Sequence, residues 1–360
     1  MREATALRHE GDDASAVTSS SASPLLSVEG VSVRVPGASG GGYLAVEDVS
    51  FVIERGETVA LVGESGSGKS LTTQAILGLL PRGVTLERGI VRLDGAEIVS
   101  ATRRMSRGVR GTKIGAVFQD PLSSLNPTMR VGEQIAELYR VHRGLSRRQA
   151  SLNACEALGE AGIADARDTY ARYPHELSGG QRQRVMIAMA LALHPSLMIA
   201  DEPTTALDLT IQAQIVELLV RLRSEHGLAV LLITHDLALV AEVAKRVIVM
   251  YAGHVMEEGP LRSIYEDAHN PYTRALLNST PSGMGESEMA VAPIPGSPPS
   301  PANRGSGCAF ATRCYMATEL CSSKRPPLAP VAMDDGVESS SRTWKSACHY
   351  RDAVREPSRA

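Results

Sequence analysis

A glycine-rich segment, GESGSGKS (Gly63–Ser70), has the residue types needed to bind phosphate groups. It fits the pattern G-x-x-x-x-G-K-[ST] and lies between the apolar run TVALVG, which is typical of a strand, and a helix predicted over Lys69–Leu80. Glycines let backbone N–H groups surround phosphate oxygens, and the helix N-terminus adds its partial positive charge. The motif alone indicates a nucleotide hydrolase, a kinase or a GTPase, and a glycine turn that binds nothing is the plainer alternative.

Within this segment the lysine and the last serine have separate expected roles. We expect Lys69 to reach the β- and γ-phosphates of ATP and Ser70 to ligate Mg²⁺. The residues that the motif predicts to bind the nucleotide are Gly63, Glu64, Ser65, Gly66, Ser67, Gly68, Lys69 and Ser70.

Two adjacent carboxylates end a second apolar run, LMIADEP (Leu197–Pro203). Asp201, at the end of this predicted strand, is expected to reach the Mg²⁺ shell. Glu202 can polarise an attacking water as a general base. A solvated acidic strand end is common by itself, but together with a phosphate loop the pair indicates nucleotide hydrolysis.

A second glycine pair opens a long predicted helix within Glu176–Leu193. Ser178, Gly179 and Gly180 expose N–H groups at the start of this helix, where an anion can bind. LSGGQ (Leu177–Gln181) matches the signature motif of the ABC ATPase family letter for letter, and here the chain resembles that family. The resemblance implies that Ser178, Gly179, Gly180 and Gln181 cap the γ-phosphate of ATP bound by a partner subunit.

Three further residues match family motifs in order along the chain. Gln119 in VFQDP resembles the Q-loop glutamine, which touches Mg²⁺ and the attacking water. Asp208 in ALD resembles the D-loop that crosses the dimer interface, and His235 in LLITHD resembles the histidine that contacts the γ-phosphate. The resemblance thus implies Glu202, His235 and Gln119 as catalytic residues and Ser70, Gln119 and Asp201 as Mg²⁺ ligands.

The residue that stacks on adenine is less well defined by the sequence. The family usually uses an aromatic side chain upstream of the phosphate loop. Tyr43 is the nearest candidate, although Val35 stands where an aromatic is expected. Tyr43 is equally consistent with a residue that only begins a strand.

The resemblance runs from about Leu25 to the end of the chain and is closest to the ATPases of dipeptide and oligopeptide importers. It includes FQDPLSSLNP (Phe118–Pro127) and HNPYTRALL (His269–Leu277), and nickel importers share these matches. It implies an ATP-hydrolysing motor subunit on the cytoplasmic face of the plasma membrane. The implied partners are a second, related ATPase chain, two transmembrane permeases and an extracytoplasmic peptide-binding protein.

The elements that must position these residues predict an α/β fold. Strands at SLMIAD, LAVLLIT and RVIVMYA, with a helix at Thr210–Ser224, indicate a parallel sheet covered on both faces. The resemblance adds a RecA-like core, an antiparallel β subdomain and an inserted helical subdomain. We predict a disordered tail over residues 1–24, a nucleotide-binding domain over 25–265 with its helical subdomain at about 121–194, and a C-terminal extension over 266–360.

Four of the five cysteines lie in that extension: Cys308, Cys314, Cys321 and Cys348. Disulfides are disfavoured in the cytosol, and the segment Ser297–Tyr350 has few large apolar residues. We therefore expect a metal centre, a [4Fe–4S] cluster or alternatively Zn²⁺, with a structural or docking role and no part in hydrolysis. Four free thiols are the other possibility, because no spacing rule here is sharp.

Composition excludes several classes of function. With 37 basic and 40 acidic residues the net charge is −3, which argues against a nucleic-acid partner. No apolar run approaches the length of about 20 residues that a membrane span needs, and the N-terminus resembles no secretory signal.

Two alternative functions remain. One is a soluble ABC ATPase that is not part of a transporter, but such proteins usually carry tandem cassettes or a coiled-coil insertion. The other is a small-molecule kinase, in which LSGGQ and His235 would have no role.

Overall fold

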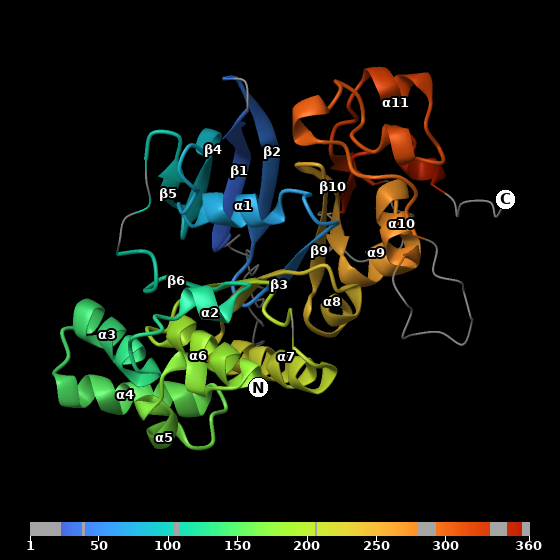
Figure 1. Cartoon of the computed structure of the whole chain (residues 1–360). Helices are drawn as coiled ribbons and strands as arrows, with labels where there is room; N and C mark the ends of the chain where they lie inside the picture. Colours follow the sequence, from blue (N-terminus) through green and yellow to red (C-terminus); the bar gives the residue numbers. More distant parts are fainter. Residues whose placement is uncertain are drawn as a thin grey trace, which may run out of the picture.

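The computed structural model describes residues 23–37, 40–103, 105, 108–205, 207–279, 293–331 and 344–354. Of the tail predicted over residues 1–24, all but the last two residues lie outside this set. In Figure 1 an antiparallel sheet (blue to teal) lies at the top, a group of helices (green) lies below it, and the C-terminal extension (orange to red) lies at the upper right.

The central sheet of the described chain has eight strands in the order β11-β12-β10-β9-β3-β8-β7-β6. The strands β9, β3, β8, β7 and β6 pair in parallel. The continuous apolar runs of β3, β7, β8 and β9 predicted this arrangement for those four strands. Every residue of β3, β8 and β9 is buried. The bounds are β3 Thr58–Val62, β6 Ile114–Val117, β7 Leu197–Asp201, β8 Ala229–Ile233, β9 Arg246–Tyr251, β10 His254–Pro260, β11 Ala329–Pro330 and β12 Lys345–Ser346.

A second, antiparallel sheet has the order β2-β1-β4-β5, which confirms the β subdomain. Its strands are β1 Leu26–Pro36, β2 Gly42–Ile53, β4 Thr85–Leu93 and β5 Ala96–Ser100. The sequence pattern predicted β1 and β2 but not β4, β5 or β6. Asp94 and Gly95 join β4 to β5 with φ of +51° and +74°, the tight turn that Asp-Gly favours.

Helix α1 (Lys69–Ile76) lies against the antiparallel sheet (Figure 1) and is shorter than the predicted Lys69–Leu80. It ends because Gly78 turns to a φ of +61°, a backbone conformation that glycine adopts without steric cost. The helical block contains α2 Pro121–Ser124, α3 Val131–Arg143, α4 Arg147–Glu160, α5 Ala166–Ala171, a 3₁₀ turn at Pro174–Glu176 and α6 Gly179–Leu191. Helices α7 (Leu209–His226) and α8 (Leu237–Val243) follow β7 and β8.

The C-terminal extension shares its apolar core with the cassette. Helix α9 (Leu261–Asp267) leads into it, and it contains α10 Pro271–Asn278, α11 Glu319–Ser323 and 3₁₀ turns at Pro301–Asn303, Ala311–Arg313 and Arg351–Ala353. The ring of Phe310 is 2% exposed and lies 5.3 Å, centroid to centroid, from both Tyr251 of β9 and Tyr272 of α10. Strand β12 also pairs with β10. The extension therefore does not depend on its own apolar residues alone.

We expect Phe310→Ala to lower the free energy of unfolding by about 3–5 kcal/mol, because it empties the centre of this aromatic cluster. Chemical denaturation of the full chain measures the change. The matched control is Leu320→Ala in α11, where the side chain is 43% exposed and the expected change is within about 0.5 kcal/mol. Equal effects of the two substitutions would contradict a shared core.

Candidate nucleotide-binding and catalytic site

The phosphate loop connects β3 to α1 and is held close to β9. Gly63 has a φ of +147°, and a Cβ there would come within 2.1 Å of the carbonyl oxygen of Met250. Gly68, with a φ of +102°, is the N-cap of α1. Only glycine fits these two positions without a shift of the backbone. The loop therefore presents its N–H groups at the start of α1, as the motif predicts.

The Lys69 side chain is buried inside the loop. Its Nζ donates to the carbonyl oxygens of Gly63 (2.7 Å) and Glu64 (3.1 Å), and lies 3.4 Å from Ser67 Oγ. Burial lowers the pKa of Lys69, while the nearby carboxylates of Glu202, Asp201 and Glu64 oppose that shift. The ammonium group therefore lies where the loop would surround phosphate oxygens.

Asp201, at the end of β7, has a carboxylate that fits a metal ligand. Its Oδ1 is buried and has no hydrogen-bond partner among the described residues. Burial raises the pKa of Asp201, a hydrogen bond from Ser70 lowers it, and Glu202 raises it further. A buried oxygen without a partner is costly, and a divalent cation would satisfy it and reverse the pKa shift. Ser70 and Asp201 thus fit the Mg²⁺ role predicted for them.

Three side chains converge on the carboxylate of Glu202, two of them from distant segments of the chain. Gln119 Nε2 donates to Glu202 Oε2 at 2.7 Å, and Thr205 Oγ1 donates to the same oxygen at 2.9 Å. His235 Nδ1 lies 3.3 Å from Oε1. Glu202 itself has a φ of +48°, which is uncommon and strained for a residue with a side chain. Strain of this kind occurs at functional sites, and here it turns the carboxylate toward the converging side chains.

Thr205 is the residue of this cluster that sequence reasoning missed. It lies three positions after Glu202, and its hydroxyl reaches back to the carboxylate across the turn that follows β7. The sequence signal that could have identified Thr205 is a hydroxyl residue only three positions after the candidate base Glu202. The structure therefore brings together Gln119, Glu202 and His235, the three residues expected to be catalytic, and adds Thr205.

The signature segment lies at the start of α6 and forms a capping box. Ser178 Oγ accepts from Gln181 N–H at 3.2 Å, and Gln181 Oε1 accepts from Ser178 N–H at 3.0 Å. The first helical N–H groups, those of Gly179 and Gly180, have no acceptor within the helix by geometry. A Cβ on Gly180 would lie 2.8 Å from Ile211 of α7, so this glycine is needed for close packing.

Two other predicted residues lie apart from the Glu202 cluster. Asp208 is the N-cap of α7, where its Oδ1 accepts from Ile211 N–H at 2.9 Å. Tyr43 is partly buried on β2 and pairs in register with Val35 on β1. The two positions considered for the adenine contact are therefore direct neighbours on one antiparallel pair.

The four cysteines of the extension line one cavity, together with Phe310 and His349. Within the described residues, however, no group of three or more His, Cys, Asp or Glu side chains is arranged to hold a metal ion. The predicted metal centre is therefore not confirmed. Burial raises the pKa of Cys314 and of Cys348 to about 11, which favours the neutral thiols over the thiolates that metals bind. The shared aromatic core also removes the argument that the extension needs a metal to fold.

Comparison with known proteins assigns two regions of the chain. Residues 46–205 match the ABC transporter family, and residues 256–321 match the oligopeptide/dipeptide transporter C-terminal region. The oligopeptide transport ATP-binding protein OppD of Bacillus subtilis is 46% identical over 301 residues, which cover 83% of this chain and 84% of that protein. The dipeptide transport ATP-binding protein DppD of Escherichia coli is 43% identical over 328 residues, covering 91% and 96%.

Other similarities agree with this assignment. A putative peptide import ATP-binding protein of Brucella melitensis is 50% identical over 304 residues, covering 81% of this chain and 90% of that protein. Among solved structures, a dimeric ATP-binding cassette in a post-hydrolysis state with ADP and Pi has a TM-score of 0.58 and 31% identity, covering 66% of this chain and 99% of that one. Within the described residues, no helix has both the length and the apolar character needed to cross a membrane.

We expect Glu202→Gln to bind ATP, to hydrolyse it about 10²–10⁴-fold more slowly, and to accumulate as a closed dimer, because an amide cannot accept the proton of the attacking water. Phosphate release measures the rate, and size-exclusion chromatography with ATP measures the dimer. Glu225→Gln, on the exposed side of α7, is the control. A Glu202→Gln rate within about threefold of the unaltered protein would remove Glu202 from this role.

Proposed function

The chain belongs to the family of ABC transporter ATP-binding proteins that includes oligopeptide and dipeptide transport ATPases, and we propose that it is the motor subunit of an importer for short peptides. The observation that best supports the ATPase role is the set of contacts that Gln119, Thr205 and His235 make to Glu202. Asp201, the expected Mg²⁺ ligand, directly precedes Glu202. The match of residues 256–321 to the peptide-transporter C-terminal region supports the substrate class.

In the proposed site, the loop residues Gly63–Ser70 bind the phosphates, and Lys69 turns from its loop carbonyls toward the β- and γ-phosphates. Ser70 and Asp201 would hold Mg²⁺, which neutralises phosphate charge when bound. Gln119 donates through Nε2 to Glu202, and its side-chain oxygen is the atom of this group that could accept from water or bind the ion.

Glu202 is the proposed general base. Gln119 and Thr205 hold its Oε2, and this fixes the carboxylate so that it can accept a proton from the attacking water. His235, at 3.3 Å from Oε1, is the proposed contact to the γ-phosphate. The water oxygen bonds to the γ-phosphorus, the bond from that phosphorus to the oxygen bridging it to the β-phosphate breaks, and ADP and phosphate are the products. The protein contributes positioning and electrostatic stabilisation.

We propose that the site is completed by a second cassette. Gln119 and His235 are both exposed, so one chain alone does not exclude water from Glu202. Ser178 is exposed as well, and the free N–H groups behind it form an anion cradle at the start of α6. A partner cassette that contributes Ser178, Gly179, Gly180 and Gln181, with Asp208 beside the interface, would close both ATP sites, and a related but different ATPase chain is the proposed partner.

The membrane partners and the location are further parts of this proposal. They are two transmembrane permease subunits, an extracytoplasmic peptide-binding protein, and a position on the cytoplasmic face of the plasma membrane. The matched relatives are named as peptide transport ATP-binding proteins, which supports peptides as cargo. Nickel is the alternative cargo, since the flanking motifs are shared with nickel importers. The stacking of adenine on Tyr43 is proposed from its place on β2.

We expect Ser178→Ala to leave ATP binding by the isolated chain within about twofold of normal, and to abolish ATP-driven uptake of a labelled tripeptide by the transporter in proteoliposomes. The reason is that the Ser178 cradle acts on the partner's ATP. Ser146→Ala is the matched control, because Ser146 caps α4 in the same helical block and its loss costs similar helix stability.

Lys69→Ala is the reference for loss of ATP binding by the chain's own loop. If Ser178→Ala lost ATP affinity in the isolated chain as severely as Lys69→Ala does, the arrangement across two subunits would be wrong. Uptake of labelled nickel in place of the tripeptide would replace peptide as the cargo and leave the ATPase assignment intact.

A metal centre in the cavity of Cys308, Cys314, Cys321 and Cys348 remains part of the proposal. It is supported by the four thiols that line one cavity, the donor set that a [4Fe–4S] cluster or Zn²⁺ prefers. Binding would require the thiols to lose their protons and to move closer together.

We expect anaerobically purified protein to contain iron, with zinc as the alternative, and Cys314→Ser to lose it. Elemental analysis is the measurement, and Cys155→Ser in α4, outside the cavity, is the control that keeps the metal. Absence of both metals from the unaltered protein would leave four free thiols.

A further inference from the structure

The C-terminal extension contacts the phosphate loop directly, at Glu64. Arg313 Nη1 donates to Glu64 Oε2 at 2.6 Å, and Nη2 donates to Oε1 at 3.0 Å, which is a bidentate ion pair. The hydroxyl oxygen of Tyr272 accepts from Glu64 N–H at 2.9 Å. Both the side chain and the backbone of one loop residue are therefore held by residues that lie more than 200 positions later in the sequence.

Arg313 is fixed by its surroundings and not only by Glu64. Its side chain is 4% exposed, and it donates to the carbonyl oxygens of Pro295 (2.7 Å) and Ile294 (3.2 Å) and to the hydroxyl of Tyr251 (3.1 Å). The guanidinium also lies 5.7 Å from the centre of the Tyr251 ring. An ion pair held this firmly loses less to side-chain entropy and to solvent screening than an exposed pair.

Glu64 is a carboxylate inside a loop whose proposed ligand is a polyanion. Without Arg313 its charge would repel the phosphates at short range. The Glu64 carbonyl also accepts from Lys69 Nζ at 3.1 Å and from Ser67 N–H at 3.1 Å. The position of Glu64 therefore affects both the charge of the loop and the placement of Lys69.

We propose that Arg313 and Tyr272 are positioning residues for nucleotide binding, so that the extension sets the affinity of the phosphate loop for ATP. They neutralise and orient Glu64 and do not themselves touch the reacting atoms. This extends the role of the cysteine-bearing segment beyond the structural or docking role expected from its place in the sequence. The inference rests on the proposed assignment of Gly63–Ser70 as the phosphate-binding loop.

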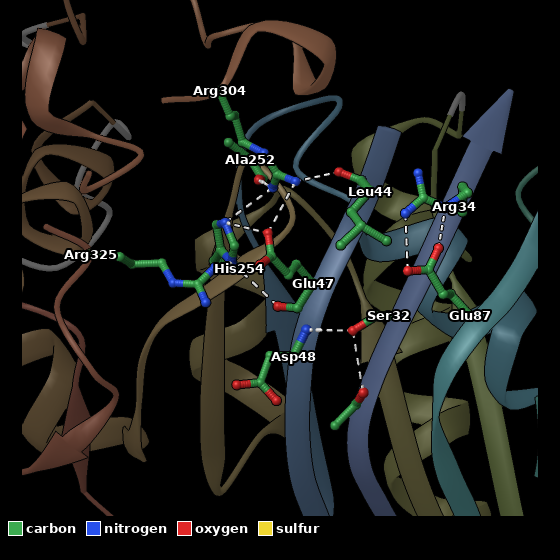
Figure 2. Close-up of polar contacts among 11 residues, drawn as sticks. Ser32, Arg34, Leu44, Glu47, Asp48, Glu87, Ala252, His254, Arg304 and Arg325 are labelled. Carbon is green, nitrogen blue, oxygen red and sulfur yellow. Dashed lines mark hydrogen bonds and ion pairs between the residues drawn. The ribbon is translucent and has the colours of Figure 1, made fainter. Parts of the chain in front are cut away.

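A second contact between extension and cassette supplies the control (Figure 2). Arg304 donates to the carbonyl oxygens of Ala252 and Leu44, and Arg325 Nη1 lies 3.0 Å from Glu47 Oε1 on β2. His254 lies between these two arginines, and burial, followed by their positive charges, lowers its pKa to about 4. Arg325 is thus an arginine of the extension that forms an ion pair with a carboxylate of the cassette outside the phosphate loop.

The test is the Kd of the full chain for a fluorescent ATP analogue. We expect Arg313→Ala to raise the Kd about fivefold or more, Arg313→Lys to raise it less, and the double variant Glu64→Gln with Arg313→Ala to restore it to within about twofold. Restoration by removing the unpaired carboxylate distinguishes positioning from general damage to the fold. Arg325→Ala should leave the Kd within about twofold of normal.

Tyr272→Phe keeps the buried ring and removes only the acceptor for Glu64 N–H, so it tests the inference even if Arg313→Ala fails to fold. We expect its Kd to rise about threefold or more. In the reconstituted transporter, Arg313→Ala and Tyr272→Phe should each raise KM for ATP and leave kcat nearly unchanged.

An unchanged Kd in Arg313→Ala and Tyr272→Phe would overturn the inference, as would a double variant no better than Arg313→Ala. The variant Lys69→Ala shows whether the further inference alone is wrong or whether the assignment of the phosphate loop is wrong as well. If Lys69→Ala bound the analogue normally, the loop assignment itself would be wrong.

Discussion

The end of strand β7 is the constraint on which the rest of the site depends. Asp201 closes a strand that is buried among parallel neighbours, and the next residue must turn out of the sheet at once. Glu202 does so with a φ of +48°, and its N–H donates to the carbonyl of Ile233 at the end of β8, 2.8 Å away. Because this turn fixes the carboxylate, Thr205 reaches it from the same turn, and Gln119 and His235 reach it from two other segments.

The parts of the fold that the sequence predicted are those with strong local signals. Strands β3, β7, β8 and β9 are continuous apolar runs because both faces of the sheet are covered, and the phosphate loop has its own motif. Strands β4 and β5 were missed because partly exposed positions interrupt their apolar pattern, although the Asp94-Gly95 turn was visible between them. Helix α1 ends early because of the backbone conformation of Gly78, and the apolar periodicity used to predict the helix does not indicate that end.

Contacts across the site were less predictable than its residues. Each motif marks one residue on one element, whereas the bond from Thr205 to Glu202 depends on how the turn after β7 folds. The pair of Arg313 and Glu64 spans 249 positions, and nothing local marks either residue as the partner of the other. Cysteine spacing predicted a shared location for the four thiols but could not give the sulfur arrangement or the burial that raises the pKa of Cys314 and Cys348.

Strand β12 has a consequence for how this chain can be shortened. It is only two residues long, yet it pairs Ser346 and Lys345 with Glu257 and Glu258 along the outer side of β10. A chain that ended after α10 would leave these N–H and C=O groups of β10 unpaired at the edge of the central sheet. Open edges of this kind are templates for pairing with strands of other molecules, and β12 covers this one.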